Sequence, residues 1–464
     1  MQRSQGSSPA PDLPIWATLS LIAATTPAEL AEEASQLGLR AEVTRDGRLQ
    51  LPGGFLAWLE AETFPSNLAD ESAAQTEVPF GPMSLHVSGG TNELEFQAHN
   101  QPADLRRLMR QMRDGVSTMA GETPRILSNA GKKVEELTAI LRVLHPLTAS
   151  VVLPRANYIS FSSAEFEAMA AAYEGHAHFP LYVFSKIRKV KTGAYAVSTG
   201  LFVFGLPEIA MLLWTSRPPL EFVRALGHIE NEMISEGWWP EHGAKFSTDI
   251  GDVRLERVVD AVLAIPVEYS IPEETIRTVR HRFAIERCAI GSFGQGQLHR
   301  LVTEDGLAVD HHVLREGESV AVTNGLSLKA QPGGTAKDGN DYVEAAVFSE
   351  RLGPWANEWL AWFAAVLNGH DGSKPVKPMD RLALPEPKEG IAGMIVWPMG
   401  YFSPYAKSSD DADATRVNLF GLVPILEEEL ALFREDPSAQ QRWTEERRAK
   451  RDLEEIHGRW SRTA

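Results

Sequence analysis

The chain has 464 residues, of which 43% are hydrophobic and 8% aromatic, and its formal net charge is −17. This length exceeds what one hydrophobic core covers, so we expect two or three domains, and the hydrophobic content argues against a disordered chain. The charge argues against nonspecific nucleic-acid binding, which requires a basic face, and it favours association with a basic partner. The single cysteine, Cys288, excludes an intramolecular disulfide framework and fits a reducing, cytoplasmic compartment.

The first 146 residues predict a flexible tail followed by an α+β region. Residues 1–13 are polar and rich in Ser and Pro, as is typical of a loose tail. In the N-terminal α+β region, 14–146, an apolar strand at 15–24 leads into a helix at 27–37 that begins with an N-cap, a proline and a capping-box glutamate. This helix start favours a strand over a signal peptide, and no apolar run reaches the roughly 20 residues that span a bilayer. Apolar stripes predict two more helices, at 103–113 and 132–144.

Two further α+β units are expected after this region. The central unit, 147–270, alternates strands with helices at 163–174 and 219–234, and the segment PVEYSIP at its end is typical of a joint. The third unit, 281–435, is rich in period-2 segments that predict strands. Residues 436–464 are charged and predict a helical tail. The fold class is therefore α+β: two or three units with antiparallel or mixed sheets, helices packed on one face, and a charged C-terminal helix.

One pattern occurs in both the central and the third unit. Gly200-Leu201, Glu208 on a strand and the helix at 219–234 parallel Gly325-Leu326, Glu344 and the helix at 355–367. The spacings differ. Two related units would explain the pattern, and so would the common occurrence of strand, turn and amphipathic helix. For the two glutamates, each inside an apolar strand, we expect pairing with an arginine or a backbone N–H.

Motifs for catalysis or cofactor binding are absent from the sequence. There is no phosphate loop and no nucleophile elbow, and the glycines of GSFGQG at 291–296 do not follow the dinucleotide-binding order. His311 and His312 are adjacent on a predicted strand, so they point to opposite faces, and His176-x-His178 lacks a third ligand. We therefore expect no catalytic residues, no metal and no cofactor.

Two segments are candidates for partner binding. Trp238 and Trp239 lie in the turn GWWPEHG, and tryptophans exposed in a rigid turn often anchor interfaces. Asp410, Asp411 and Asp413 form an acidic cluster in the loop SSDDADAT. The alternatives are that the two indoles pack inward and that the loop is a solvated connection.

The C-terminal third resembles the suppressor-of-fused-like domain of bacteria. The resemblance rests on four features: Gly325-Leu326 closing a strand, Glu344 on a strand, the Trp-rich helix 355–362, and the segment 417–429, a strand that is broken by Pro424 and continues as an acidic helix. Upstream, the segment YAVSTGLFVFGLPEIAM resembles an uncharacterised bacterial domain that is often encoded near suppressor-of-fused-like domains, over about 145–265. Bacterial members of this kind resemble immunity proteins that bind toxins.

The resemblance implies a non-enzymatic, cytoplasmic immunity protein that binds and neutralises a cognate polymorphic toxin. Its partner would be a protein, with no nucleic acid and no membrane involved. The first alternative is a peptide-binding adaptor or chaperone that uses an exposed sheet edge. The second is a hydrolase with an unrecognised site, against which the missing nucleophile and metal motifs count.

Overall fold

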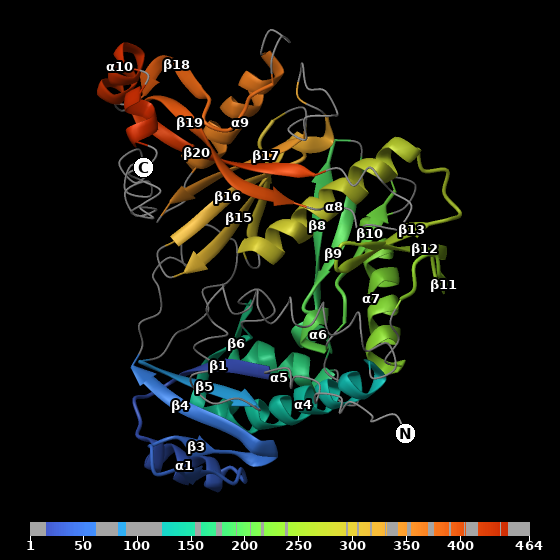
Figure 1. The fold of residues 1–464 in the computed structure, drawn as a ribbon. Coiled ribbons are helices and arrows are strands. Elements are labelled where there is room, and N and C mark those ends of the chain that lie inside the picture. The colour runs from blue at the N-terminus through green and yellow to red at the C-terminus, as the bar shows by residue number, and fades with distance from the viewer. Residues whose placement is uncertain are drawn as a thin grey trace, which may run out of the picture.

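The computed structural model describes most of the chain. The described residues are 15–61, 82–89, 123–153, 159–172, 179–191, 193–204, 206–214, 218–236, 240–293, 296–303, 306–315, 318–329, 331, 342–349, 354–369, 375–388, 391–402, 404, 416–436 and 438–443. They form three β-sheets with helices between and around them (Figure 1). The predicted α+β class is confirmed. The helix predicted at 103–113 lies outside the described residues.

The first sheet has the strand order β2-β3-β4-β5-β1-β6-β7, with antiparallel neighbours throughout. Its strands are β1 (Ile15–Leu21), β2 (Glu42–Val43), β3 (Leu49–Gln50), β4 (Phe55–Ala61), β5 (Met83–Gly89), β6 (Thr148–Leu153) and β7 (Ile159–Ser162). Its helices are α1 (Pro27–Gln36), α4 (Thr123–Leu144) and α5 (Ser163–Ala172). The capping box predicted for α1 is present between Thr26 and Glu29. Strands β6 and β7 follow residue 147, where the central unit was expected to begin, and they pair into this first sheet.

The second sheet has the order β11-β12-β13-β10-β9-β8. Its elements are α6 (Phe179–Tyr182), β8 (Phe184–Val190), β9 (Gly193–Thr199), the 3-10 helix η5 (Leu201–Phe204), β10 (Ile209–Leu213), α7 (Pro219–Glu236), β11 (Lys245–Thr248), β12 (Gly251–Val258), β13 (Ala261–Pro266) and α8 (Glu273–Phe293). Strand β10 runs parallel to β13, and every other pair is antiparallel.

The third sheet has the order β14-β15-β16-β17-β20-β19-β18. Its elements are β14 (Gly296–Leu301), β15 (Ala308–Arg315), β16 (Glu318–Asn324), the 3-10 helix η6 (Leu326–Leu328), β17 (Val343–Ser349), α9 (Pro354–Gly369), β18 (Arg381–Lys388), β19 (Ile391–Phe402), β20 (Val417–Leu426) and α10 (Glu427–Glu435). Only β17 and β20 are parallel among its pairs. Of the predicted charged tail, residues 438–443 are described, and they are helical.

The second and third sheets repeat one topology. The order β8-β9-β10-β13-β12-β11 matches β15-β16-β17-β20-β19-β18, and the parallel pair occupies the same place in each. In each, a 3-10 helix follows the second strand, a long helix follows the third, and a last helix follows the sixth. We call β8 to α8 the first repeat and β15 to α10 the second repeat. The parallel between residues 200–234 and 325–367 therefore reflects two units of the same architecture.

Helices α7, α8 and α9 form layers with these two sheets. Helix α7 packs on one face of the second sheet, α8 lies between the second and third sheets, and α9 covers the far face of the third (Figure 1). Ile276, Val279 and Phe283 of α8 pack on the second sheet, whereas Ile285 and Ala289 pack on the third. One helix thus completes two cores.

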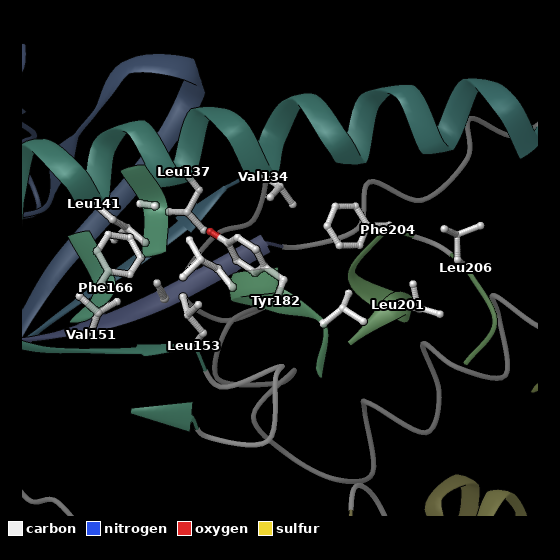
Figure 2. Packing of buried hydrophobic residues seen from close by; sticks show 14 of the residues in the cluster. Val134, Leu137, Leu141, Val151, Leu153, Phe166, Tyr182, Leu201, Phe204 and Leu206 are labelled. Atoms are coloured by element: carbon white, nitrogen blue, oxygen red, sulfur yellow. The ribbon is translucent and has the colours of Figure 1, made fainter. Parts of the chain in front are cut away.

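The N-terminal unit shares a continuous core with the first repeat. Figure 2 shows Val134, Leu137 and Leu141 of α4 beside Tyr182 of α6 and Phe204 of η5. The hydroxyls of Thr138 and Tyr182 are 2.9 Å apart and join the same two units. Hydrophobic side chains of α7 belong to this cluster too, so α7 connects the second sheet with the N-terminal unit.

The tryptophans of α9 give a test of the third-sheet core. Trp359 is 5% exposed and packs edge-on against Trp362, as the helical spacing predicts for an inward position. Replacing Trp359 by alanine should lower the free energy of unfolding by about 3–5 kcal/mol, the usual cost of removing a large buried aromatic. Urea unfolding followed by circular dichroism measures this. An unchanged midpoint would contradict the packing of α9, and Glu358→Ala on the exposed side of the helix is the control.

Candidate functional site

The residues predicted to bind a partner, Trp238, Trp239, Asp410, Asp411 and Asp413, all lie outside the described residues, as do His176 and His178. The part of the chain that the structure describes offers three other polar arrangements that could carry function. These are the charged residues around α8, two buried glutamates at matching positions of the two repeats, and a series of hydrogen bonds between side chains of the first sheet.

The α8 seam is the first of these, and we define it as the charged residues of α8 with their partners on the second and third sheets. Arg282, Glu286 and Arg287 are 2%, 4% and 6% exposed, although charged side chains are rarely buried without partners. They are buried because α8 has a sheet on both sides. Each therefore needs a partner on one of those sheets.

On the side of the second sheet, Glu286 and Arg287 are paired. The Glu286 carboxylate accepts hydrogen bonds from Arg188 Nη2 at 2.9 Å and from the Tyr195 hydroxyl at 2.9 Å. Arg287 donates to both carboxylate oxygens of Asp260, at 2.8 and 3.0 Å. Arg188 belongs to the basic tract SKIRKVK at 185–191, and the strand that carries it, β8, is an edge of the second sheet.

On the side of the third sheet, α8 holds the turn that follows β16. Arg282 donates through Nη1 to the Asn324 carbonyl oxygen at 2.9 Å and through Nη2 to the Gly306 carbonyl oxygen. The His281 Nε2 lies 2.8 Å from the Ser327 hydroxyl, and burial lowers the pKa of His281 to about 4. His281 is therefore neutral at physiological pH. Both contacts are structural ties between α8 and the second repeat.

The second arrangement is a pair of carboxylate locks. In the first lock, Glu208 accepts from the Ser198 hydroxyl at 2.6 Å and from the Gly200 N–H at 2.8 Å. In the second lock, Glu344 accepts from the Thr323 hydroxyl at 2.5 Å and from the Gly325 N–H at 3.1 Å. The predicted pairing of both glutamates with backbone N–H groups is thus present.

The two locks agree in further detail. In each, the hydroxyl two residues before the glycine also accepts the N–H of the residue after the glutamate: Ile209 at 2.7 Å in the first lock and Ala345 at 2.7 Å in the second. Both glycines have left-handed backbones, with φ of +113° at Gly200 and +111° at Gly325, which other residues rarely adopt. The carboxylates therefore fix a left-handed turn at the same point of each repeat.

The third arrangement crosses the first sheet and was not anticipated from the sequence. The Thr18 hydroxyl lies 3.0 Å from His86 Nδ1, and His86 Nε2 lies 3.3 Å from a carboxylate oxygen of Glu60. The indole N–H of Trp58 donates to the other Glu60 oxygen at 3.2 Å. A hydroxyl, an imidazole and a carboxylate in line are the components of a nucleophile activated by a base.

Acyl transfer at Thr18 would need N–H donors for the developing oxyanion. Strand β1 lies between β5 and β6, and Thr18 is paired with His86 on one side and Val152 on the other. The backbone of β1 is thus hydrogen-bonded to β5 on one side and β6 on the other, so it does not offer these N–H donors to a substrate. Sequence patterns could not have shown this series of hydrogen bonds, because its members lie on three strands and Thr18 and His86 are 68 positions apart in the sequence.

Within the described segments, no group of three or more His, Cys, Asp or Glu side chains is placed to hold a metal ion. Of the helices that the structure describes, none combines the length and the apolar character required to cross a membrane.

Comparison with known proteins gives one weak likeness. No protein-family model and no curated protein matches the chain. A solved structure of a putative SUFU (suppressor of fused protein) homolog from Neisseria gonorrhoeae FA 1090 is similar, with 16% sequence identity and a TM-score of 0.24, over 34% of this chain and 83% of that chain. At this sequence identity and TM-score, the likeness assigns no role to any residue of the chain.

Proposed function

We propose that this protein is a non-enzymatic, cytoplasmic immunity protein, which neutralises a cognate polymorphic toxin by binding it. The toxin is inhibited because the bound protein covers its catalytic cleft or the path of its substrate. No residue of the immunity protein performs chemistry in this mechanism.

The observation that supports the proposal best is the role of the buried carboxylates. Glu208 and Glu344 would be the first candidates for a general base, since each is buried inside an apolar sheet. Both use their oxygens to accept hydrogen bonds from the hydroxyl and backbone groups of their own repeat. A carboxylate held in this way stabilises a turn and is not aimed at a substrate.

Net charge supports association with a basic partner. At −17, the chain attracts a cationic protein at long range, which raises the association rate more than the final affinity. We therefore expect the association rate with the toxin to fall as salt is added, with a smaller change in the dissociation rate.

The sheet edges favour binding through a face over addition of a peptide strand. Strand β18, an edge of the third sheet, contains Pro385 and Pro387, and β11, an edge of the second, has only four residues. The other edge of the second sheet, β8, carries Lys186 and Lys189. Prolines, short strands and lysines are devices that keep an edge from pairing with another chain. We therefore prefer an immunity protein to a peptide-binding adaptor.

The hydrogen-bonded residues Thr18, His86 and Glu60 of the first sheet provide a test that distinguishes binding from catalysis. Thr18→Val removes the hydroxyl while keeping the shape of the side chain, and His86→Gln removes the base. If binding alone protects, host cells that express the cognate toxin should survive equally with wild type and both variants. A variant that still folds and binds the toxin but no longer protects would establish catalysis at Thr18 and His86.

A further inference from the structure

Glu230 of α7 is a buried carboxyl group that the fold does not fully satisfy. Its side chain is 3% exposed, and its Oε1 has no hydrogen-bond partner among the described residues. A hydrogen bond links its carboxyl group to Ser185 of β8, and the neighbouring charge is Glu208 of the first lock. Two buried carboxyl groups are thus near enough to each other for their charges to interact.

The second repeat has a small apolar residue at the position that corresponds to Glu230. Residues 222–233 of α7 and residues 356–367 of α9 agree in burial at ten of twelve aligned positions, and the two that differ are Val223 against Asn357 and His228 against Trp362. In this alignment Ala225 and Leu226 match Trp359 and Leu360, and Glu230 matches Ala364, which is 5% exposed. The first repeat therefore buries an acid where the second buries a methyl group.

Two carboxylates whose charges interact in an apolar environment do not both stay ionised. Glu208 is the member suited to the negative charge, because it accepts two hydrogen bonds and lies in the field of Arg287 on α8. Glu230 is therefore the carboxyl group of the two that stays protonated. Burial, and after it the charge of Glu208, raises the pKa of Glu230 to about 8.

We propose that the docking of α7 on the second sheet is proton-dependent, with Glu230 as the group that must stay protonated. When the proton is lost, two adjacent carboxylates repel each other beneath α7, and the helix loosens from β10. Since hydrophobic residues of α7 also belong to the core around α4 and η5, loosening α7 weakens the contact with the N-terminal unit. The device is specific to the first repeat.

The charged groups around Glu230 can be named element by element. The charge of Glu208, which directly precedes β10, acts on it, and Ser185 of β8 forms a hydrogen bond with it. Arg287, on the far side of the second sheet, acts on Glu208 and is itself held by Asp260. His228 and Glu232 of α7 lie on its exposed side, with 47% and 42% of their side chains exposed.

The direction of the pH dependence follows from the two states of Glu230. In the unfolded chain the group loses its proton near its ordinary value of 4.5, whereas in the folded protein it keeps the proton up to about pH 8. Folding therefore takes up a proton between these values. Stability is highest at the acidic end of this window and falls as pH rises, with the unfolding constant increasing at most about tenfold per pH unit for one proton.

Hydrogen exchange of the intact chain tests the proposal, with α9 as an internal reference that has alanine at the matching position. The protection of α7 amides relative to α9 amides is measured from pH 6.5 to 9 for wild type, Glu230→Gln and Glu232→Gln, with and without EDTA. We expect the ratio to fall with rising pH in wild type and in Glu232→Gln, the control on the exposed side of the same helix. We expect it to stay constant in Glu230→Gln, whose amide cannot ionise.

Three results would overturn the proposal. The first is a wild-type ratio that does not change with pH, which decides the matter even if a variant fails to fold. The second is a pH dependence that persists in Glu230→Gln. The third is a loss of α7 protection caused by EDTA at pH 7, since the pair would then hold a metal ion in place of a proton.

Discussion

Replacing Glu344 by alanine should destabilise the protein by at least about 3 kcal/mol. The Glu344 carboxylate accepts hydrogen bonds from the N–H groups of Gly325 and Ser327, at 3.1 and 3.0 Å, and from two hydroxyls, all around a fully buried side chain. Without it these donors have no acceptor, and each unsatisfied buried group costs about 1–3 kcal/mol. Urea unfolding of the variant measures the loss, with Glu344→Gln as an intermediate case because it keeps one acceptor oxygen.

The matched control is Glu358→Ala, since Glu358 is an exposed carboxylate on α9 in the same repeat. It should change the unfolding midpoint very little. If Glu344→Ala proved as stable as Glu358→Ala, the carboxylate would not hold the turn at Gly325. The second lock would then have no structural role.

Removing Arg188 should cost about 3–5 kcal/mol, because Arg188→Met leaves the buried Glu286 carboxylate without its cation. The Arg188–Glu286 pair has side chains that are 9% and 5% exposed, with the charges 2.9 Å apart. The double variant Arg188→Met, Glu286→Leu should recover much of this loss, since replacing both members of a buried ion pair by apolar residues is often tolerated. Unfolding of the single and double variants in urea gives both numbers.

A surface ion pair provides the comparison for this prediction. Arg254 and Glu256 are 2.8 Å apart, but the Arg254 side chain is 45% exposed. Arg254→Met should therefore cost no more than about 1 kcal/mol. Equal losses at Arg188 and Arg254 would mean that water reaches the α8 seam and that α8 does not seal the second sheet against the third.

The sequence was most informative where a local pattern determines the structure. Helical spacing placed Trp355 and Trp359 in the core, and the motif Thr26-Pro27-Ala28-Glu29 marked the start of α1. Glu208 and Glu344 each lie among apolar residues of a predicted strand, and this pattern predicted that the carboxylate pairs with an arginine or a backbone N–H. In each case the deciding contacts lie within one element or between neighbouring strands.

Long-range partners could not be predicted in the same way. The partner of Arg188 is Glu286, 98 residues away, and nothing in the tract SKIRKVK identifies it. Helix α8 is a second example, because burial against two sheets removes the polar face by which a surface helix is recognised. The third unit was expected to begin at residue 281, but this position lies inside α8, which starts at Glu273.

The proposal of binding without catalysis is tested most directly by titration. The proposed cognate toxin would be purified and its activity measured after incubation with increasing amounts of this protein. A stoichiometric inhibitor should abolish the activity at a fixed molar ratio, with an end point that does not move with incubation time, and the toxin should regain its activity once the complex is separated under denaturing conditions. Inactivation by a small fraction of an equivalent, increasing with time and leaving a chemically altered toxin, would contradict it.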